Sequence, residues 1–164
     1  MHDDANIRSR GYFIARTTAT CWHCRRPTPL LALAVPSGHA ALDPEDSVVD
    51  EAQANAWSVM HRPAFLFYVG SLSATVRSRL ERLAPSYSIA RREDDMDGCW
   101  ANHCVQCGAC LGDHELFCEP DGAFVPTSQS RAGSIRLSAT GEPFAALAAG
   151  YIPDPPFFDA MCKE

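Results

Sequence analysis

Two pairs of cysteines carry the chemistry that is most legible in this sequence. Both pairs have C-x-x-C spacing: Cys21 with Cys24, and Cys104 with Cys107. Two thiols three positions apart fit within one tight turn, whose backbone N–H groups can point at the sulfurs. Two such turns facing each other make the tetrahedral four-thiolate cage that Zn²⁺ prefers. The spacing therefore predicts a structural Zn²⁺ ion held by these four residues.

The residues that follow the two turns differ. Gly108 comes directly after the second pair, where a glycine lets the chain turn back with positive φ, whereas Arg25 follows the first pair. Residues 25–103 separate the pairs, far more than the roughly 15–20 residues of a simple zinc finger. Alternative interpretations are a redox dithiol, a disulfide or separate core cysteines.

Other residues near the turns leave the ligand set open. Cys110 or His103 could replace one of the four ligands. Cys99, Cys118 and Cys162 are interpreted as small core or surface residues. We expect Trp22 and Trp100 to pack as apolar lids over the sulfurs.

The gross composition is that of an ordinary globular protein. The chain has 164 residues, 46% of them apolar and 21% charged, with a net charge of −6. Four thiolates and one dication would make the protein about two charge units more acidic. We expect a cytoplasmic protein, because the sequence has no secretion signal or membrane span. Eight cysteines in that reducing compartment favour metal binding over disulfides.

The pattern of apolar residues predicts an α+β fold: a split zinc ribbon whose two β arms are separated by a strand/helix insertion. We expect one zinc-binding domain over residues 1–164, with arms at 11–36 and 98–118 and an insertion at 40–97. A C-terminal strand, helix and proline-rich tail occupy 126–164. Expected strands are 12–18, 28–35, 64–69, 87–92 and 135–137. Helices are expected at 49–60 and 143–149, and a third is capped by Ser73 and has Val76, Leu80 and Leu83 on one face. Residues 126–134 are expected to be a surface loop. The tail is expected to be irregular, and its Phe157 and Phe158 to cover an open edge or to contact a partner.

The two turns and their flanks, about a third of the chain, resemble the zinc-ribbon class. More narrowly, Cys-Trp-x-Cys, the run 102–109 (Asn-His-Cys-Val-Gln-Cys-Gly-Ala) and Gly112-Asp113 are similar to a group of small bacterial proteins of unassigned function. The resemblance implies zinc at the four cysteines. It implies no activity.

Known catalytic motifs are incomplete in this chain. His114-Glu115 begins like a metalloprotease helix, but Cys118 stands where the second histidine belongs. The H-x-E pattern of zinc deaminases is absent from the sequence. Asp113, His114 and Glu115 could act as acid or base if they converged. A zinc-dependent hydrolase is therefore the weakest of the three hypotheses, and we expect no enzyme.

Charge separates the two remaining hypotheses. Arginines near the first turn and around residues 77–92 fit a nucleic-acid-binding or transcription-associated zinc ribbon. However, acidic residues outnumber Lys and Arg by 20 to 14. We therefore expect a zinc-stabilised interaction module, an adaptor or an inhibitor of immunity type, that binds a basic protein partner. Its expected surface combines residues 43–51 with Asp94, Asp95 and Asp97.

Overall fold

The computed structural model describes residues 5–42, 57–90 and 98–164. These residues are 46% strand and 17% helix, and their twelve strands join into one large mixed sheet. The predicted α+β split ribbon is therefore wrong, and the protein is mostly β. The two cysteine turns do lie at hairpin tips, but both hairpins belong to the one sheet.

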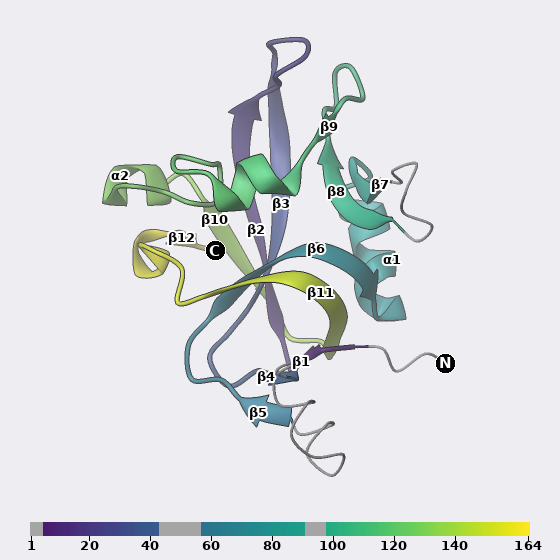
Figure 1. Ribbon diagram of the computed structural model, residues 1–164, viewed down its shortest axis with the longest axis vertical. Coiled ribbons are helices and arrows are strands. Elements are labelled where there is room, and N and C mark those ends of the chain that lie inside the picture. The colour runs from purple at the N-terminus through teal and green to yellow at the C-terminus, as the bar shows by residue number, and fades with distance from the viewer. Residues whose placement is uncertain (1–4, 43–56, 91–97) are drawn as a thin grey trace.

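Figure 1 shows the order of these elements. The strands are β1 (Ile7–Ser9), β2 (Tyr12–Thr20), β3 (Pro27–Val35), β4 (Ala40–Leu42), β5 (Trp57–Val59), β6 (Ala64–Leu72), β7 (Tyr87–Ala90), β8 (Cys99–His103), β9 (Cys110–Leu111), β10 (Arg136–Thr140), β11 (Phe144–Pro153) and β12 (Cys162–Lys163). The helices are α1 (Ala74–Leu83) and α2 (Gln129–Ala132), with a π-helical turn at His114–Cys118 and a 3₁₀ turn at Phe158–Ala160.

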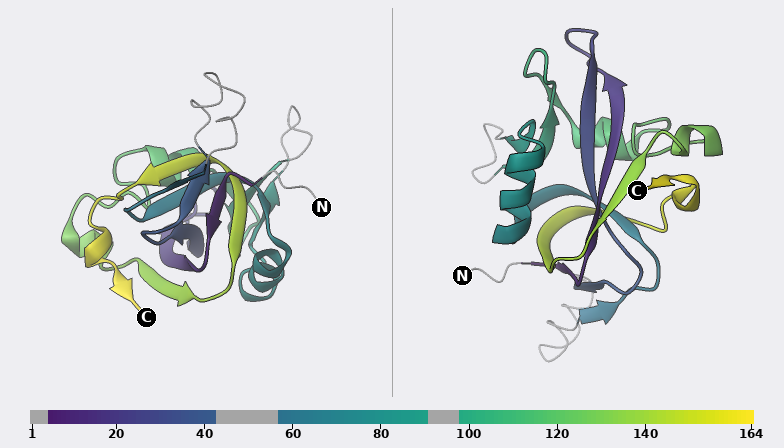
Figure 2. Two further views of the ribbon diagram at one scale, coloured as in Figure 1. Left: turned by 90° about the horizontal axis from the view of Figure 1, so that it is seen from below. Right: turned by 180° about the vertical axis from the view of Figure 1, so that it is seen from behind.

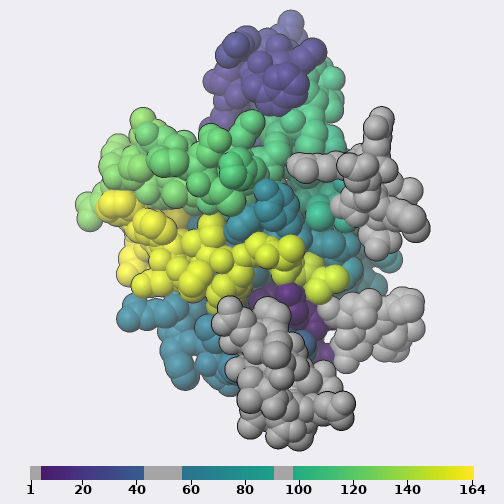
Figure 3. Space-filling view, viewed as in Figure 1, coloured from purple at the N-terminus to yellow at the C-terminus, as the bar shows by residue number. Residues whose placement is uncertain are grey.

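The strands lie in the order β12-β10-β2-β3-β6-β11-β1-β4-β5, with β8 beside β6, and β7 and β9 beside β8. Only β10 and β12 pair in parallel in the described part of the chain. The tips of the β2–β3 and β8–β9 hairpins lie side by side at one end of the molecule in Figure 1 and in the right panel of Figure 2. The β2–β3 tip, in purple, projects from the space-filling surface in Figure 3.

Strand β3 lies between β2 and β6 in the sheet and is buried on both faces. Leu31, Leu33 and Val35 join one apolar cluster, which includes α1 and Trp100, while Leu30 and Ala32 join a second cluster on the opposite face. A strand covered on both sides needs a continuous apolar run rather than alternation, and residues 30–35 supply one. The second cluster contains Cys21 and Cys104, so the candidate metal site is continuous with the core.

The helix predicted over 143–149 is a strand. Phe144, Ala146 and Ala148 are buried, whereas the residues between them are more exposed, which is the two-residue period of a sheet. Strand β11 pairs with β6 and with β1. Alanine's helix propensity is a weak preference, and here the tertiary contacts override it.

Other expected elements are partly wrong. Residues 57–59 form β5 rather than helix, while 43–56 and 91–97 lie outside the described residues. The expected loop at 126–134 contains α2, and the tail is regular enough to add the 3₁₀ turn and β12. On α1, Val76 and Leu80 are buried as predicted, but Leu83 is 51% exposed. In the tail, Phe158 is buried and Phe157 is exposed.

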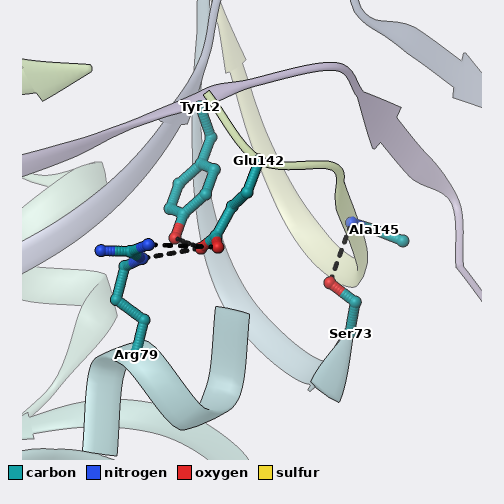
Figure 4. Close-up of polar contacts among 5 residues, drawn as sticks. All are labelled: Tyr12, Ser73, Arg79, Glu142 and Ala145. Atoms are coloured by element: carbon teal, nitrogen blue, oxygen red, sulfur yellow. Dashed lines mark hydrogen bonds and ion pairs between the residues drawn. The ribbon is translucent and has the colours of Figure 1, made fainter. Parts of the chain in front are cut away.

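Helix α1 is fastened to the sheet by polar contacts (Figure 4). The buried Tyr12 hydroxyl donates to Glu142 at 2.7 Å, and Arg79 of α1 donates to both oxygens of the same carboxylate at 2.8 and 3.2 Å. Ser73 stands at the N-cap of α1, but its hydroxyl accepts from the N–H of Ala145 at 3.3 Å instead of capping the helix. One carboxylate thus links β2, α1 and the connection between β10 and β11.

Candidate metal centre

The two cysteine turns have the same backbone geometry. The N–H of Arg25 donates to the carbonyl of Cys21 at 3.0 Å, and the N–H of Gly108 donates to the carbonyl of Cys104 at 2.9 Å. Both residues that close the turns have positive φ, 64° at Arg25 and 79° at Gly108. The first turn therefore adopts the bend that the second achieves with glycine, and an arginine bears its strain.

The backbone also points donors at the sulfurs. The N–H of His23 lies 3.4 Å from the Sγ atom of Cys21, and the N–H of Gln106 lies 3.3 Å from the Sγ atom of Cys104. N–H groups aimed at a sulfur stabilise its thiolate form. The sulfur of the first cysteine in each pair thus contacts a backbone N–H of its own turn.

The four sulfurs converge as the sequence predicts. The Sγ atoms of Cys21 and Cys107 are 3.7 Å apart, as are those of Cys24 and Cys104, and all four lie within 4.8 Å of one another. A tetrahedral zinc with Zn–S bonds of about 2.3 Å requires sulfurs separated by about 3.8 Å. None of the eight cysteines forms a disulfide, so neither pair is one. The cluster can hold a metal ion, which each hairpin would bind with two ligands.

Burial and hydrogen bonds within the cluster shift the pKa values of Cys104 and Cys107. Burial raises the pKa of Cys104, but the N–H groups of Cys107 and Gln106 and contacts with the neighbouring thiols lower it to about 6. The N–H of Ala109 lowers the pKa of Cys107, but burial and contacts with the other three thiols raise it to about 11. The contacts with the neighbouring thiols thus favour the thiolate form at Cys104 and the neutral thiol at Cys107.

Four hydrogen bonds hold the second turn against the first hairpin. The buried side chain of Asn102 accepts from the N–H of Leu31 at 2.8 Å and donates to its carbonyl at 2.9 Å, as a neighbouring strand would. The N–H of Val105 donates to the buried hydroxyl of Thr28 at 3.1 Å. The indole N–H of Trp22 donates to the carbonyl of Cys110 at 2.9 Å. These contacts bring the two tips together.

Sequence reasoning missed Asn102 and Thr28 as positioning residues. Thr28 is a polar residue at the start of an apolar strand, and Asn102 lies two positions before the second cysteine pair. Both positions are signals that could have been used. Their partners, Leu31 for Asn102 and Val105 for Thr28, are set by the tertiary structure.

The alternative ligands lie outside the cluster. Cys110 is exposed and is not among the grouped sulfurs. The Nδ1 atom of His103 lies 3.1 Å from the carbonyl of Ser86, on the side of β7. Trp22 remains at the tips but is 54% exposed, and Trp100 packs in the other apolar cluster. The prediction that Trp100 covers the sulfurs is therefore wrong.

Asp113, His114 and Glu115 do not form a converging acid–base group. The Asp113 carboxylate is buried and accepts from the N–H of Tyr68 at 2.8 Å, whereas His114 and Glu115 are exposed. Tyr68 has a φ of 49°, so this hydrogen bond supports a strained point of β6. Burial raises the pKa of Asp113 to about 6, although the bond from Tyr68 lowers it. The Asp113 carboxylate therefore has a structural role, which is to accept a hydrogen bond from the backbone of β6.

Comparisons with known proteins find no family model, curated protein or solved structure that matches this chain. The resemblance to zinc ribbons thus depends on the cysteine turns alone. Among the described residues, no helix combines the length and the apolar character needed to cross a membrane.

Proposed function

We propose that the four thiols bind one structural Zn²⁺ ion and that the protein is an interaction module for a basic protein partner. The observation that carries the proposal is the closure of the site: four sulfurs from two hairpins lie within 4.8 Å of one another. A catalytic zinc keeps a coordination position for water, whereas four thiolates fill all four. The ion would hold the two hairpin tips together, and the protein surface would bind the partner.

The donor set supports zinc over other ions. Thiolates select soft or borderline metals, and a tetrahedral four-sulfur site suits zinc or iron. Zinc has no redox chemistry and tolerates the half-exposed setting created by the exposed Cys107.

Charge supports a basic partner. Acidic residues exceed basic ones by six, and four thiolates with one dication deepen that excess. Residues 43–51 and Asp94, Asp95 and Asp97, which we proposed as the acidic surface, lie outside the described residues. Glu115, Glu119 and Asp121 are exposed acids in the described part.

Metal analysis of the purified protein tests the zinc site. We expect one Zn²⁺ per chain in the wild type and none in Cys24→Ser, with loss of hairpin structure, because structural zinc contributes roughly 10–16 kcal/mol in zinc-finger peptides. Cys118→Ser is the matched control, since Cys118 is an exposed thiol outside the cluster. Equal zinc contents in the two variants would refute the assignment.

Salt dependence tests the partner. The tagged, zinc-loaded protein should retain a basic protein from its native host at low salt and release it at high salt, because exposed ion pairs are screened. Retention of only neutral or acidic proteins would contradict the proposal.

A second candidate function is nucleic-acid binding at the tip of the β2–β3 hairpin. Trp22, Arg25 and Arg26 are exposed together on this projecting turn, and arginines with an aromatic ring can bind phosphates and stack on bases. A gel shift that weakens steeply with salt and disappears in Arg25→Ala/Arg26→Ala would support this candidate.

A further inference from the structure

Strand β2 has an open edge beside the metal centre. Strand β10 pairs with β2 only from Tyr12 to Arg16, whereas β3 pairs with β2 as far as Thr20. Within the described part of the chain, residues 17–20 therefore have a neighbouring strand on one side only. Open strand edges present unpaired backbone groups that can accept another strand.

The register identifies the backbone groups on this edge. The N–H of Cys21 donates to the carbonyl of Arg26, so the backbone of Cys21 faces β3. Because strand residues alternate, Thr18 and Thr20 face the other way, on the side where Arg16 pairs with Arg136. Their N–H and C=O groups have no partner among the described residues. These four groups continue the line along which β10 binds β2.

A groove of about 360 Å³ runs along this edge. Its far wall comes from the segment that leaves the second cysteine turn and from the approach to β10. Both apolar and polar side chains line it. The lining includes Trp22, Leu116, Ala123 and Pro126, together with Glu115 and Arg131.

The groove carries one negative charge that is not compensated by a neighbouring positive side chain of the described residues. Arg131 forms an ion pair with Asp121 at 3.0 Å, so these two charges compensate each other. Glu115 is exposed on the groove and has no ion-pair partner within the described part of the chain. The uncompensated charge is thus a carboxylate, which complements a Lys or Arg side chain.

We propose that this groove binds an extended basic segment of a partner protein as an added strand on β2. The segment's backbone hydrogen-bonds to Thr18 and Thr20, its apolar side chains contact Leu116 and Pro126, and a basic side chain meets Glu115. Such strand addition gives affinity through the main chain and specificity through alternate side chains. The inference deepens the proposed function by assigning a site and a ligand to it, and it rests on that function.

The test uses zinc-loaded, full-length protein and synthetic pentapeptides. The probe is acetyl-Val-Lys-Val-Lys-Val-amide with a fluorescent label, and the charge control replaces both lysines with glutamates. We expect anisotropy to report binding of the lysine peptide at least fivefold tighter than the glutamate peptide. In the amide NMR spectrum, the largest shifts should fall on Thr18 and Thr20.

Two further changes test the backbone pairing and the charge contact one at a time. N-methylation of alternate peptide amides removes backbone donors without touching the protein, and we expect about tenfold weaker binding. Glu115→Gln should weaken the lysine peptide about two- to fivefold, whereas Glu119→Gln, an exposed acid outside the groove lining, should change it less than twofold. Unchanged binding of the N-methylated peptide, equal effects of the two glutamine variants, or NMR shifts mapped elsewhere would overturn the proposal.

The same variants separate this inference from the broader function. If Glu115→Gln and N-methylation have no effect while the basic host partner still binds, the module stands and the groove assignment is wrong. If the purified protein contains no zinc and retains no basic host protein, but the peptide still binds the groove, then the groove assignment is correct and the proposed function is wrong. Competition by a single-stranded oligonucleotide instead of by unlabelled peptide would assign the groove to nucleic acid and overturn the proposal.

Discussion

At the scale of single residues, Arg25 shows how much a cysteine turn of the candidate metal centre depends on backbone conformation. It has a φ of 64° at the position where the second turn has Gly108. A left-handed conformation costs an L-residue with a side chain roughly 1–2 kcal/mol, and glycine avoids that cost. The turn geometry is the same in spite of the different residue.

We therefore expect Arg25→Gly to raise the free energy of unfolding of the metal-loaded protein by about 1 kcal/mol. Urea unfolding followed by circular dichroism measures it. Arg26→Gly is the control, because Arg26 has no positive φ and glycine there should lower stability by about 0.5–1 kcal/mol. A loss of stability in Arg25→Gly would show that the arginine side chain makes a compensating contact.

Asp113 predicts a pH dependence of stability. Its pKa is about 6 in the folded protein because of burial, against 3.8 for the ordinary carboxyl. The folded state thus binds the proton more tightly than the unfolded state, so the stabilisation is complete below pH 3.8 and is lost as pH rises through 6. The loss amounts to about 2–3 kcal/mol.

Replacing Asp113 with asparagine tests this sign. Asn can still accept from the N–H of Tyr68 but does not ionise. We expect the difference in unfolding free energy between Asp113→Asn and wild type to grow in favour of the variant from pH 4 to pH 7. Comparing the two proteins at each pH cancels the titration of the cysteines. A constant difference would mean that the carboxyl stays neutral or stays charged throughout.

At the scale of elements, the two hairpins are positioned by a side chain acting as a piece of strand. Asn102 of β8 bonds both the N–H and the carbonyl of Leu31 in β3, although these strands are not paired there. The second cysteine turn begins two residues later. These two hydrogen bonds therefore help to position the second cysteine turn against the first hairpin.

We expect Asn102→Asp to lower stability by about 1–3 kcal/mol, because aspartate cannot donate to the Leu31 carbonyl and would bury a charge. Metal affinity should fall as well, since the second turn loses its position. Chelator competition and urea unfolding measure the two effects. Gln129→Glu, which adds the same charge on an exposed site of α2, should leave both values unchanged.

At the scale of the whole molecule, Glu142 joins parts of the sheet that are far apart in sequence. It accepts from Tyr12 and pairs with Arg79, so it connects β2 to α1 across the β10–β11 connection. The bonds from Arg79 and then from Tyr12 lower the pKa of Glu142. These contacts contribute stability above the ordinary carboxyl pKa and lose it as pH falls.

Removing the Glu142 carboxylate should leave the buried Tyr12 hydroxyl without a hydrogen-bond acceptor, which lowers the free energy of unfolding. We expect Glu142→Ala to destabilise the protein by about 1–3 kcal/mol, mainly because the Tyr12 hydroxyl loses its acceptor. In a Tyr12→Phe background the same change should cost much less. Thermal or urea unfolding of the four proteins of this cycle measures the coupling. Equal costs in the two backgrounds would refute the assigned role of Tyr12.

The sequence alone identified the four thiols, because C-x-x-C spacing is a local property that places two sulfurs in one turn. It also identified β2, β3 and β6, whose apolar and β-branched runs are unambiguous. Local patterns also placed α1, β7 and part of β10, whereas the remaining strands required tertiary contacts. Phe144–Pro153 is alanine-rich and compatible with a helix, and only burial between β6 and β1 makes it a strand.

Only the three-dimensional structure decided which residues support the metal centre and which edge of the sheet stays open. Cys110 is as near in sequence to Cys107 as Cys104 is, yet it starts β9 and its sulfur lies outside the cluster. Thr18 and Thr20 face an open edge only because β10 stops pairing at Arg16. Such outcomes depend on long-range pairing and register, which no local pattern of residue types specifies.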